Sequence, residues 1–212
     1  MIGRPRIVSR GGEQRDEIAL TFDDGPSAWT MEIAAIFERH GCHTTFFLRG
    51  PAVEERPEEV AALAAGGHEL GNHLWSHSNS ETLSRDELRA ELSRTANAIQ
   101  AAGGGCPSLI RPPYLRGPEK VADAATGCGV SAIVLGSMGI PDWIASSADE
   151  IVEPVLTAAA PGDIVCLHDG VSPDRPDTDT RAPTAEAARQ LVPALLERGL
   201  RPVTVSLLLA GD

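Results

Sequence analysis

The chain has 212 residues, with 18 Lys and Arg against 30 Asp and Glu, which gives a formal net charge of −12. This acidic balance argues against nucleic acid as the main partner, because phosphate binding requires clustered Lys and Arg. No apolar run approaches the roughly 20 residues that span a bilayer. The apolar fraction of 42% suffices for a core, so we expect one globular domain over residues 1–212.

Two local features indicate the compartment in which the protein works. Residues 1–17 are charged throughout and lack the apolar segment of a secretion signal, so we expect a cytoplasmic protein. The four cysteines are far apart and form no CxxC pair, which disfavours a thiolate zinc site or a disulfide framework and predicts buried thiols. They are Cys42, Cys106, Cys128 and Cys166.

Apolar and amphipathic runs alternate along the chain. The predicted strands are Ile18–Phe22, His43–Leu48, His68–Gly71, Ser108–Arg111, Ser131–Leu135, Asp163–Leu167 and Pro202–Leu207. The predicted helices are Thr30–Arg39, Pro57–Ala65, Arg85–Ala101, Pro118–Thr126, Ala148–Ala159 and Ala185–Glu197. Repeated strand–helix–strand units indicate parallel strands joined by crossover helices, which fits either an open doubly wound sheet or a (β/α) barrel.

Five polar clusters follow predicted strands. They are TFDDGP at 21–26, GHELGNHLWSH at 67–77, RPPY at 111–114, PDW at 141–143 and CLHDG at 166–170. In a parallel α/β fold the carboxyl ends of the strands meet at one face, and active sites of such folds lie there. We therefore expect the five clusters to converge on one site.

The first two clusters together predict a metal site. Side chains of adjacent strand residues point to opposite sides, so of Asp23 and Asp24 one can bind a metal while the other acts on water. His73 and His77 are four positions apart, a spacing that brings two imidazoles within reach of one divalent ion. Each pattern alone is also typical of a turn or a solvated surface. Combined, they leave coordination positions open for water and substrate.

The other three clusters add a cation, an indole and a further imidazole. Arg111 carries a permanent charge that orients a nearby carboxylate, although a surface arginine before a diproline turn is the alternative. Trp143, taken by itself, is more typical of a core position. His168 emerges from the end of a predicted strand.

In this order the five clusters resemble the motifs of the polysaccharide deacetylase family, also called carbohydrate esterase family 4 or the NodB-homology domain. The resemblance spans Thr21 to Asp169. It implies a distorted (β/α)7-8 TIM-like barrel and a divalent metal, most often zinc, bound by Asp24, His73 and His77. The same donor set also accepts cobalt, nickel or manganese.

The resemblance also implies the roles of the remaining site residues. Asp23 matches the general base and His168 the general acid. Arg111 matches the arginine that holds the base, and Asp142 the acidic partner of that arginine. The backbone amide of Tyr114 helps to stabilise the oxyanion. Two further positions, Trp143 and Leu167, line an apolar pocket for the acetyl methyl group.

These roles imply hydrolytic removal of an N-acetyl group from an N-acetylated amino sugar, as polymer, oligomer or small glycoconjugate. Asp23 takes a proton from water and His168 gives one to the leaving amine, so we expect a bell-shaped pH–rate profile.

One departure from the family motifs concerns Gly139, where family members commonly carry Asp or a similar polar residue. This departure bears on the substrate class, because a polar group near the cleft is missing.

Two other functions remain open at this point. An amidohydrolase of the same scaffold acts on a non-sugar small-molecule amide or an acylated biosynthetic intermediate. A degenerate domain binds glycan without hydrolysing it, but the presence of every base, acid and metal-binding residue argues against this. Exposed aromatics for stacking on a long glycan are scarce, the candidates being Trp29, Trp75, Tyr114 and Trp143. With the negative charge, this favours a short substrate that is neutral or basic.

The stretch Ser172–Pro183 is rich in Pro and Asp and is predicted to be a loop. Because it closely follows His168, we expect it to border the cleft. A solvated loop is the simplest interpretation. A lid, or an element that repels anionic polymers, is the functional alternative.

Overall fold

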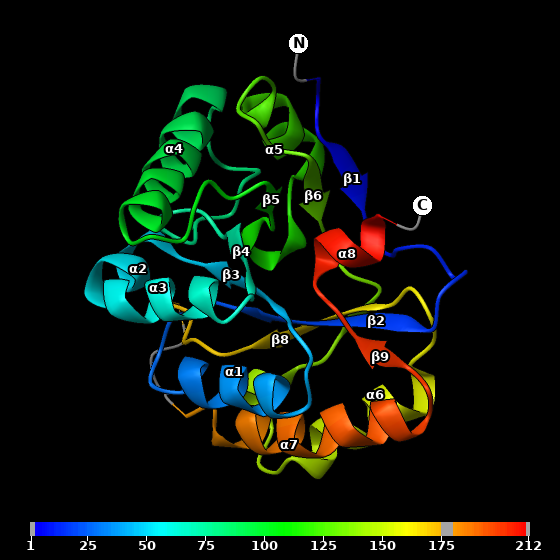
Figure 1. Ribbon diagram of the computed structural model, residues 1–212. Coiled ribbons are helices and arrows are strands. Elements are labelled where there is room, and N and C mark those ends of the chain that lie inside the picture. Colours follow the sequence, from blue (N-terminus) through cyan, green and yellow to red (C-terminus); the bar gives the residue numbers. More distant parts are fainter. Residues whose placement is uncertain (1–2, 175–179, 211–212) are drawn as a thin grey trace.

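In the computed structural model, which describes residues 3–174 and 180–210, a curled sheet is surrounded by helices (Figure 1). The strands are β1 (Arg6–Val8), β2 (Glu17–Asp23), β3 (Thr45–Leu48), β4 (Glu69–Asn72), β5 (Leu109–Ile110), β6 (Ala132–Val134), β7 (Met138–Gly139), β8 (Ile164–His168) and β9 (Arg201–Pro202). The α-helices are α1 (Thr30–Arg39), α2 (Gly50–Glu55), α3 (Pro57–Ala65), α4 (Arg85–Ala101), α5 (Pro118–Ala125), α6 (Asp149–Ala158), α7 (Ala182–Glu197) and α8 (Val205–Leu209). Two single turns of 3-10 helix are η1 (Pro113–Leu115) and η2 (Asp142–Ile144).

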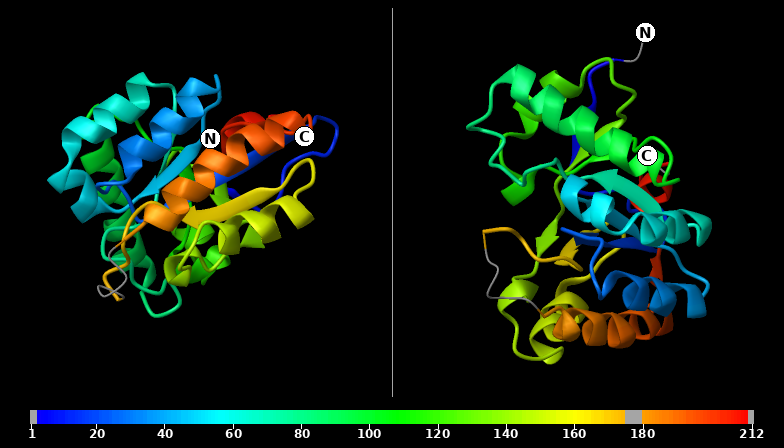
Figure 2. Two further views of the ribbon diagram at one scale, coloured as in Figure 1. Left: turned by 90° about the horizontal axis from the view of Figure 1, so that it is seen from below. Right: turned by 90° about the vertical axis from the view of Figure 1, so that its left-hand side faces the viewer.

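The strands pair in the order β1-β6-β5-β4-β3-β2-β8-β7, and β9 joins β2 from outside this path. All of these pairs are parallel. The sheet curls, and the helices lie around its outside (Figures 1 and 2), with α2 to α5 above it and α1, α6 and α7 below it in the view of Figure 1. A curled parallel sheet with helices around it confirms the expected distorted (β/α) barrel and differs from a flat doubly wound sheet, which has helices on both faces.

The core fills the space between the central strands and the helices outside them. Phe22 of β2 stacks on Phe46 of β3 with ring centroids 5.6 Å apart, and meets the edge of Phe37 of α1 at 5.9 Å. Ile33 and Ile36 place further apolar side chains on the same face of α1. Each such fully buried side chain contributes about 1.5–3 kcal/mol, so β2 and β3 form a rigid base beneath the polar residues at their ends.

The first six predicted strands and all six predicted helices are confirmed, with ends that differ by at most three residues. The last predicted strand, Pro202–Leu207, was wrong. Only Pro202 continues a strand, and Thr204 then accepts a hydrogen bond from the backbone N–H of Leu207 and begins α8. The apolar run of α8 packs one face of a helical turn, which a short sequence cannot distinguish from a strand.

The four cysteines are free thiols that differ in burial. Cys42 and Cys166 are buried, as expected, but Cys106 and Cys128 are exposed, so the prediction of four buried thiols was wrong. Both exposed cysteines precede short strands, at loops that meet solvent.

Within the described ranges, no helix has the length and apolar character to cross a membrane.

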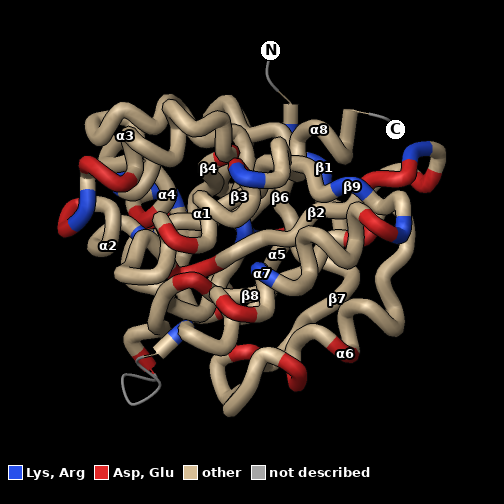
Figure 3. Tube along the Cα trace, turned by 60° about the horizontal axis from the view of Figure 1, so that its bottom comes forward, with Lys and Arg blue, Asp and Glu red and all other residues tan. Residues whose placement is uncertain are grey.

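Asp and Glu residues occur at many positions along the outer helices (Figure 3). Glu58 and Glu59 lie in the first turn of α3, and Asp149 and Glu150 in the first turn of α6. Negative charge at a helix N-terminus interacts favourably with the helix dipole. Part of the negative charge of the protein therefore stabilises the N-termini of helices.

His68, at the start of β4, makes folding stability depend on pH. Its Nδ1 accepts the backbone N–H of Thr44 at 3.2 Å, its side chain is buried, and burial lowers its pKa below the ordinary value of 6.5. Because the unfolded chain binds this proton more readily, the stability is present above pH 6.5 and is lost as pH falls. Urea unfolding across this range should give a shallower dependence for His68→Gln, whereas the exposed His40→Gln should behave like the wild type.

Candidate active site

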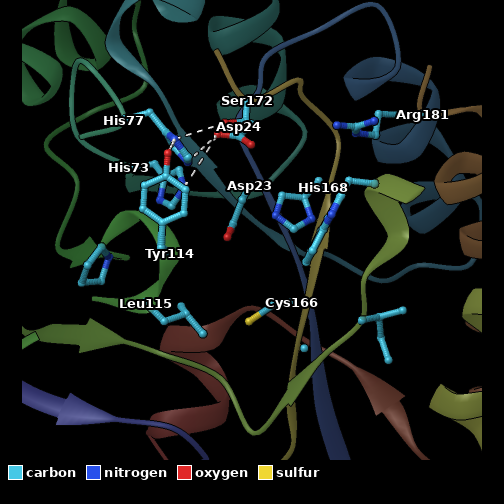
Figure 4. Close-up of a pocket in the computed structure, with 14 residues that line it drawn as sticks. Asp23, Asp24, His73, His77, Tyr114, Leu115, Cys166, His168, Ser172 and Arg181 are labelled. Carbon is cyan, nitrogen blue, oxygen red and sulfur yellow. Dashed lines mark hydrogen bonds and ion pairs between the residues drawn. The ribbon is translucent and has the colours of Figure 1, made fainter. Parts of the chain in front are cut away.

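A cavity of about 210 Å³ opens where the carboxyl ends of the strands meet, and all five polar clusters contribute to it (Figure 4). The residues that line it are Asp23, Asp24, His73, His77, Pro112, Tyr114, Leu115, Gly139, Ile140, Trp143, Cys166, His168, Ser172 and Arg181. The expected convergence of the clusters on one face is therefore confirmed.

Asp24, His73 and His77 are all buried, and their ligand atoms lie within 4.8 Å of one another. Oδ1 of Asp24 is 3.3 Å from Nε2 of His77 and 3.9 Å from Nε2 of His73. That carboxylate oxygen is buried and receives no hydrogen bond. Nε of Arg49 forms an ion pair with it at 3.5 Å but does not hydrogen-bond it. Because a buried carboxylate oxygen without a hydrogen bond is costly, the oxygen and the two imidazole nitrogens fit a cation.

The tautomer of His73 suits metal binding. Its Nδ1 donates to the carbonyl oxygen of Arg111 at 2.7 Å, which leaves the Nε2 lone pair directed at Asp24. Burial lowers the pKa of His73 to about 3, and burial also lowers the pKa of His77. Both rings are therefore neutral at physiological pH, as a metal ligand must be.

The backbone around Asp24 is shaped for this position. Asp24 and His77 have φ angles of 76° and 60°, in the left-handed region that L side chains rarely adopt. Gly25 follows, and a Cβ there would overlap the carboxylate of Asp169. This close approach explains why the motif requires glycine next to the metal-binding carboxylate.

Asp23 is held by a buried arginine. Nη1 of Arg111 donates to Oδ1 of Asp23 at 2.7 Å and to Oγ1 of Thr21 at 2.7 Å, while the guanidinium carbon lies 4.1 Å from the centroid of the Phe47 ring. Arg111 itself is 0% exposed. The predicted pairing of Arg111 with Asp23 is confirmed.

Asp142 was assigned the wrong partner by the sequence. Its Oδ1 accepts Nδ1–H of His168 at 2.7 Å, and its Oδ2 accepts the backbone N–H of His168 at 2.8 Å and the hydroxyl of Thr184 at 2.9 Å. The strand order explains this, because η2 follows β7 and β7 lies beside β8, whereas Arg111 follows β5 on the other side of the sheet. Burial lowers the pKa of His168, but the Asp142 carboxylate outweighs it and raises the pKa to about 9.

The predicted apolar wall is half correct. Trp143 lines the cavity and meets the His168 ring edge-on at a centroid distance of 5.0 Å. Leu167 does not line it, because it is 0% exposed and packs into the core between β2 and the helices. Side chains alternate along β8, so Cys166 and His168 face the cavity and Leu167 faces away.

Several lining residues were not predicted. Cys166 could have been found from strand alternation with His168. Ser172 and Arg181 come from the Pro- and Asp-rich loop and the residue that precedes α7, where no periodic signal exists. Ser172 confirms that the loop borders the cavity, while residues 175–179 lie outside the described residues, so the lid interpretation stays a prediction.

Two hydroxyl groups lie within hydrogen-bonding distance of Nδ1 of His77. Oη of Tyr114 is 3.1 Å from it and Oγ of Ser172 is 3.2 Å from it. When Nδ1–H donates to either oxygen, Nε2 is left free to bind metal. Because Tyr114 belongs to η1 and Ser172 to the loop after β8, segments far apart in the sequence orient one ligand.

This arrangement predicts that the hydroxyl groups support metal binding together. The double variant Tyr114→Phe/Ser172→Ala should weaken metal binding by about 10–100-fold, measured by competition with a chelator. Each single variant should have a smaller effect, because the other oxygen still accepts. Ser78→Ala, which removes a nearby hydroxyl that does not contact His77 but hydrogen-bonds Ser76, is the control. Unchanged affinity in the double variant would contradict the role.

The curled (β/α) barrel and its donor groups define a metal-dependent hydrolase. A family model described as Polysaccharide deacetylase matches residues 10–133. The chitooligosaccharide deacetylase of Sinorhizobium fredii is 34% identical over 202 residues, which cover 92% of each chain. The chain therefore belongs to the polysaccharide deacetylase family, as its five motifs predict.

Solved structures agree with this assignment. The crystal structure of the peptidoglycan N-acetylglucosamine deacetylase Bc1960, in complex with 4-naphthalen-1-yl-N-oxidanyl-benzamide, is similar with a TM-score of 0.87 and 30% identity, covering 96% of this chain and 92% of that one. BA3943 of Bacillus anthracis, a pseudoenzyme of carbohydrate esterase family 4, has a TM-score of 0.86 and 26% identity, covering 97% and 69%. Because an enzyme and a pseudoenzyme share the fold, activity must be argued from the site residues.

Proposed function

We propose that the protein is a metal-dependent N-deacetylase that removes the acetyl group from an N-acetylated amino sugar, as polymer, oligomer or small glycoconjugate. One observation carries the proposal: Asp23 and His168 are paired in register on β2 and β8, beside the Asp24, His73 and His77 cluster. A base and an acid thus flank one metal site. The names of the relatives, which are deacetylases of chitooligosaccharides and of peptidoglycan, support the same reaction.

Asp24, His73 and His77 would hold the metal, and zinc is the ion we propose for this set of one carboxylate and two imidazoles. Cobalt, nickel and manganese are alternatives for the same donors. When bound, a divalent metal at this site polarises the amide carbonyl and makes a neighbouring water more acidic.

The residues of the chain then divide the proton transfers between them. Asp23, fixed by Arg111, takes a proton from the attacking water as the oxygen bonds to the carbonyl carbon. The backbone N–H of Tyr114 donates to the oxyanion that forms. His168, protonated below a pKa of about 9, gives its proton to the amine nitrogen as the C–N bond breaks. The products are acetate and the free amine.

The aromatic residues around the cavity favour a short substrate. Trp75, an expected stacking residue, is covered, because Arg94 lies 3.4 Å from its ring centroid and Gly50 packs against it. Tyr114, which is 49% exposed, remains at the cavity. Among the described residues that line the cavity, Tyr114 and Trp143 are the aromatic rings of this kind, and they offer little surface for a long glycan.

Acetate release tests the proposal, with metal content assayed on the same sample. We expect acetate from N-acetylglucosamine oligomers and no release from small amides that lack a sugar. Turnover of small amides alone would establish the non-sugar amidohydrolase instead. Binding of the oligomers to metal-loaded protein without any acetate would establish a glycan-binding domain.

A further inference from the structure

The cavity has an apolar side chain and a thiol beneath Asp23 (Figure 4). Leu115 and Cys166 point toward each other there, below Asp23 (Figure 4). The thiol of Cys166 donates to the carbonyl oxygen of Leu135 at 3.1 Å, and burial raises its pKa to about 11, so it stays neutral. The Leu115 side chain and this neutral thiol give the recess a lining that suits an alkyl group.

Gly139 borders the same recess from the next strand. It pairs in register with Cys166, and paired residues of neighbouring strands present their side chains on the same face. A side chain at Gly139 would therefore point into the cavity, which Gly139 already lines. Because glycine has no side chain, no side chain closes the recess at this position.

Nothing in the packing requires glycine at position 139. A Cβ built there meets no atom within 4 Å, and its φ lies outside the left-handed range, in contrast to Gly25 and Gly71, where a Cβ would overlap a side chain. Gly139 is also exposed, and β7 is the last strand in the order of the described sheet. The recess is thus open at the free edge of the sheet.

We propose that the site accepts N-acyl groups longer than acetyl, and that Gly139 determines this tolerance by leaving the recess open beside Cys166. This inference rests on the proposed function, since it assumes that the carbonyl reacts between Asp23 and His168. The alkyl part of the acyl group then extends over Cys166 and past Gly139. A closed pocket discriminates against one added methylene by about 10–200-fold, and an open one does not.

The test compares chitooligosaccharides of one length that carry N-acetyl, N-propionyl or N-butyryl groups. For the wild type, kcat/KM on the longer groups should stay within about tenfold of the N-acetyl value. Gly139→Leu should lower the ratio of kcat/KM on N-butyryl to kcat/KM on N-acetyl by about tenfold or more relative to the wild type. Gly3→Val, at another glycine with open space and ordinary φ, is the control, and thermal unfolding verifies that each variant folds.

Two results would overturn the proposal: wild-type discrimination against N-propionyl by about 100-fold or more, or equal losses on all three substrates in Gly139→Leu. Calorimetric binding of acetate, propionate and butyrate to the metal-loaded protein tests the recess without turnover. Butyrate should bind at least as tightly as acetate, and Gly139→Leu should weaken butyrate selectively. If no substrate is hydrolysed yet this pattern appears, the proposed function fails while the recess stands. Weaker binding of butyrate than of acetate by the wild type contradicts the recess.

Discussion

Asp23→Asn is expected to lower kcat for deacetylation by about 10²–10⁴-fold while the protein still binds its metal. Asparagine has the shape of aspartate but cannot accept a proton from water. Because Asp24, His73 and His77 form the metal cluster without Asp23, metal content should not change. The measurement is acetate release at saturating substrate, with metal content determined on the same sample.

The variant also leaves a buried cation without its partner. Arg111 is fully buried and pairs with Asp23 at 2.7 Å, so loss of the carboxylate should destabilise the fold by about 3–5 kcal/mol. Activity is therefore compared well below the unfolding midpoint of the variant. Asp24→Asn is the matched variant, and it should lose metal and activity together. Normal turnover by Asp23→Asn would contradict the assignment of the base.

The parts of the site that depend on local sequence could be predicted. The spacing of His73 and His77 and the two carboxylates at a strand end predicted a metal site here, and the resemblance to the family selected Asp24 over Asp23 as its carboxylate. Strand alternation would also have replaced Leu167 by Cys166 in the cavity wall. These features follow from the periodicity of one element, which the sequence displays directly.

Features that depend on the order of strands could not be read in this way. Asp142 contacts His168 because β7 lies beside β8, and nothing local to either segment specifies that neighbourhood. The short strands β1 and β7 were likewise missed, since two or three residues carry no periodic pattern. The sheet assembles them through contacts with distant segments.

The proposed base and the proposed acid each pair with a different residue of opposite charge. Arg111 holds the carboxylate of Asp23 in an ion pair at 2.7 Å, while the carboxylate of Asp142 favours the protonated imidazole of His168. Asp23 and His168 are neighbours in register, so a shared environment would give them related protonation states. Opposite partners on either side keep a base and an acid next to each other.

Asp142→Asn is therefore expected to move the alkaline limb of the pH–rate profile. In the wild type, His168 has a pKa raised to about 9, so the acid is protonated and the rate is maintained up to that pH. Without the Asp142 carboxylate, burial still lowers the pKa of His168, and only the charges of Asp23 and Asp24 still raise it, so the pKa should fall from about 9. The protonated fraction of His168 at about pH 8 should therefore fall, and kcat measured against pH should decline at a lower pH than in the wild type.

The same substitution changes how stability depends on pH. A histidine whose pKa is raised on folding stabilises the protein below the unfolded value of 6.5, and this contribution disappears as pH rises through about 9. Asp142→Asn should remove that dependence, measured by unfolding midpoints across this range. Asp149→Asn, an exposed carboxylate in the first turn of α6, should leave both profiles unchanged. An alkaline limb that stays near pH 9 in Asp142→Asn would show that another group sets it, because the carboxylate that raises the pKa of His168 is then gone.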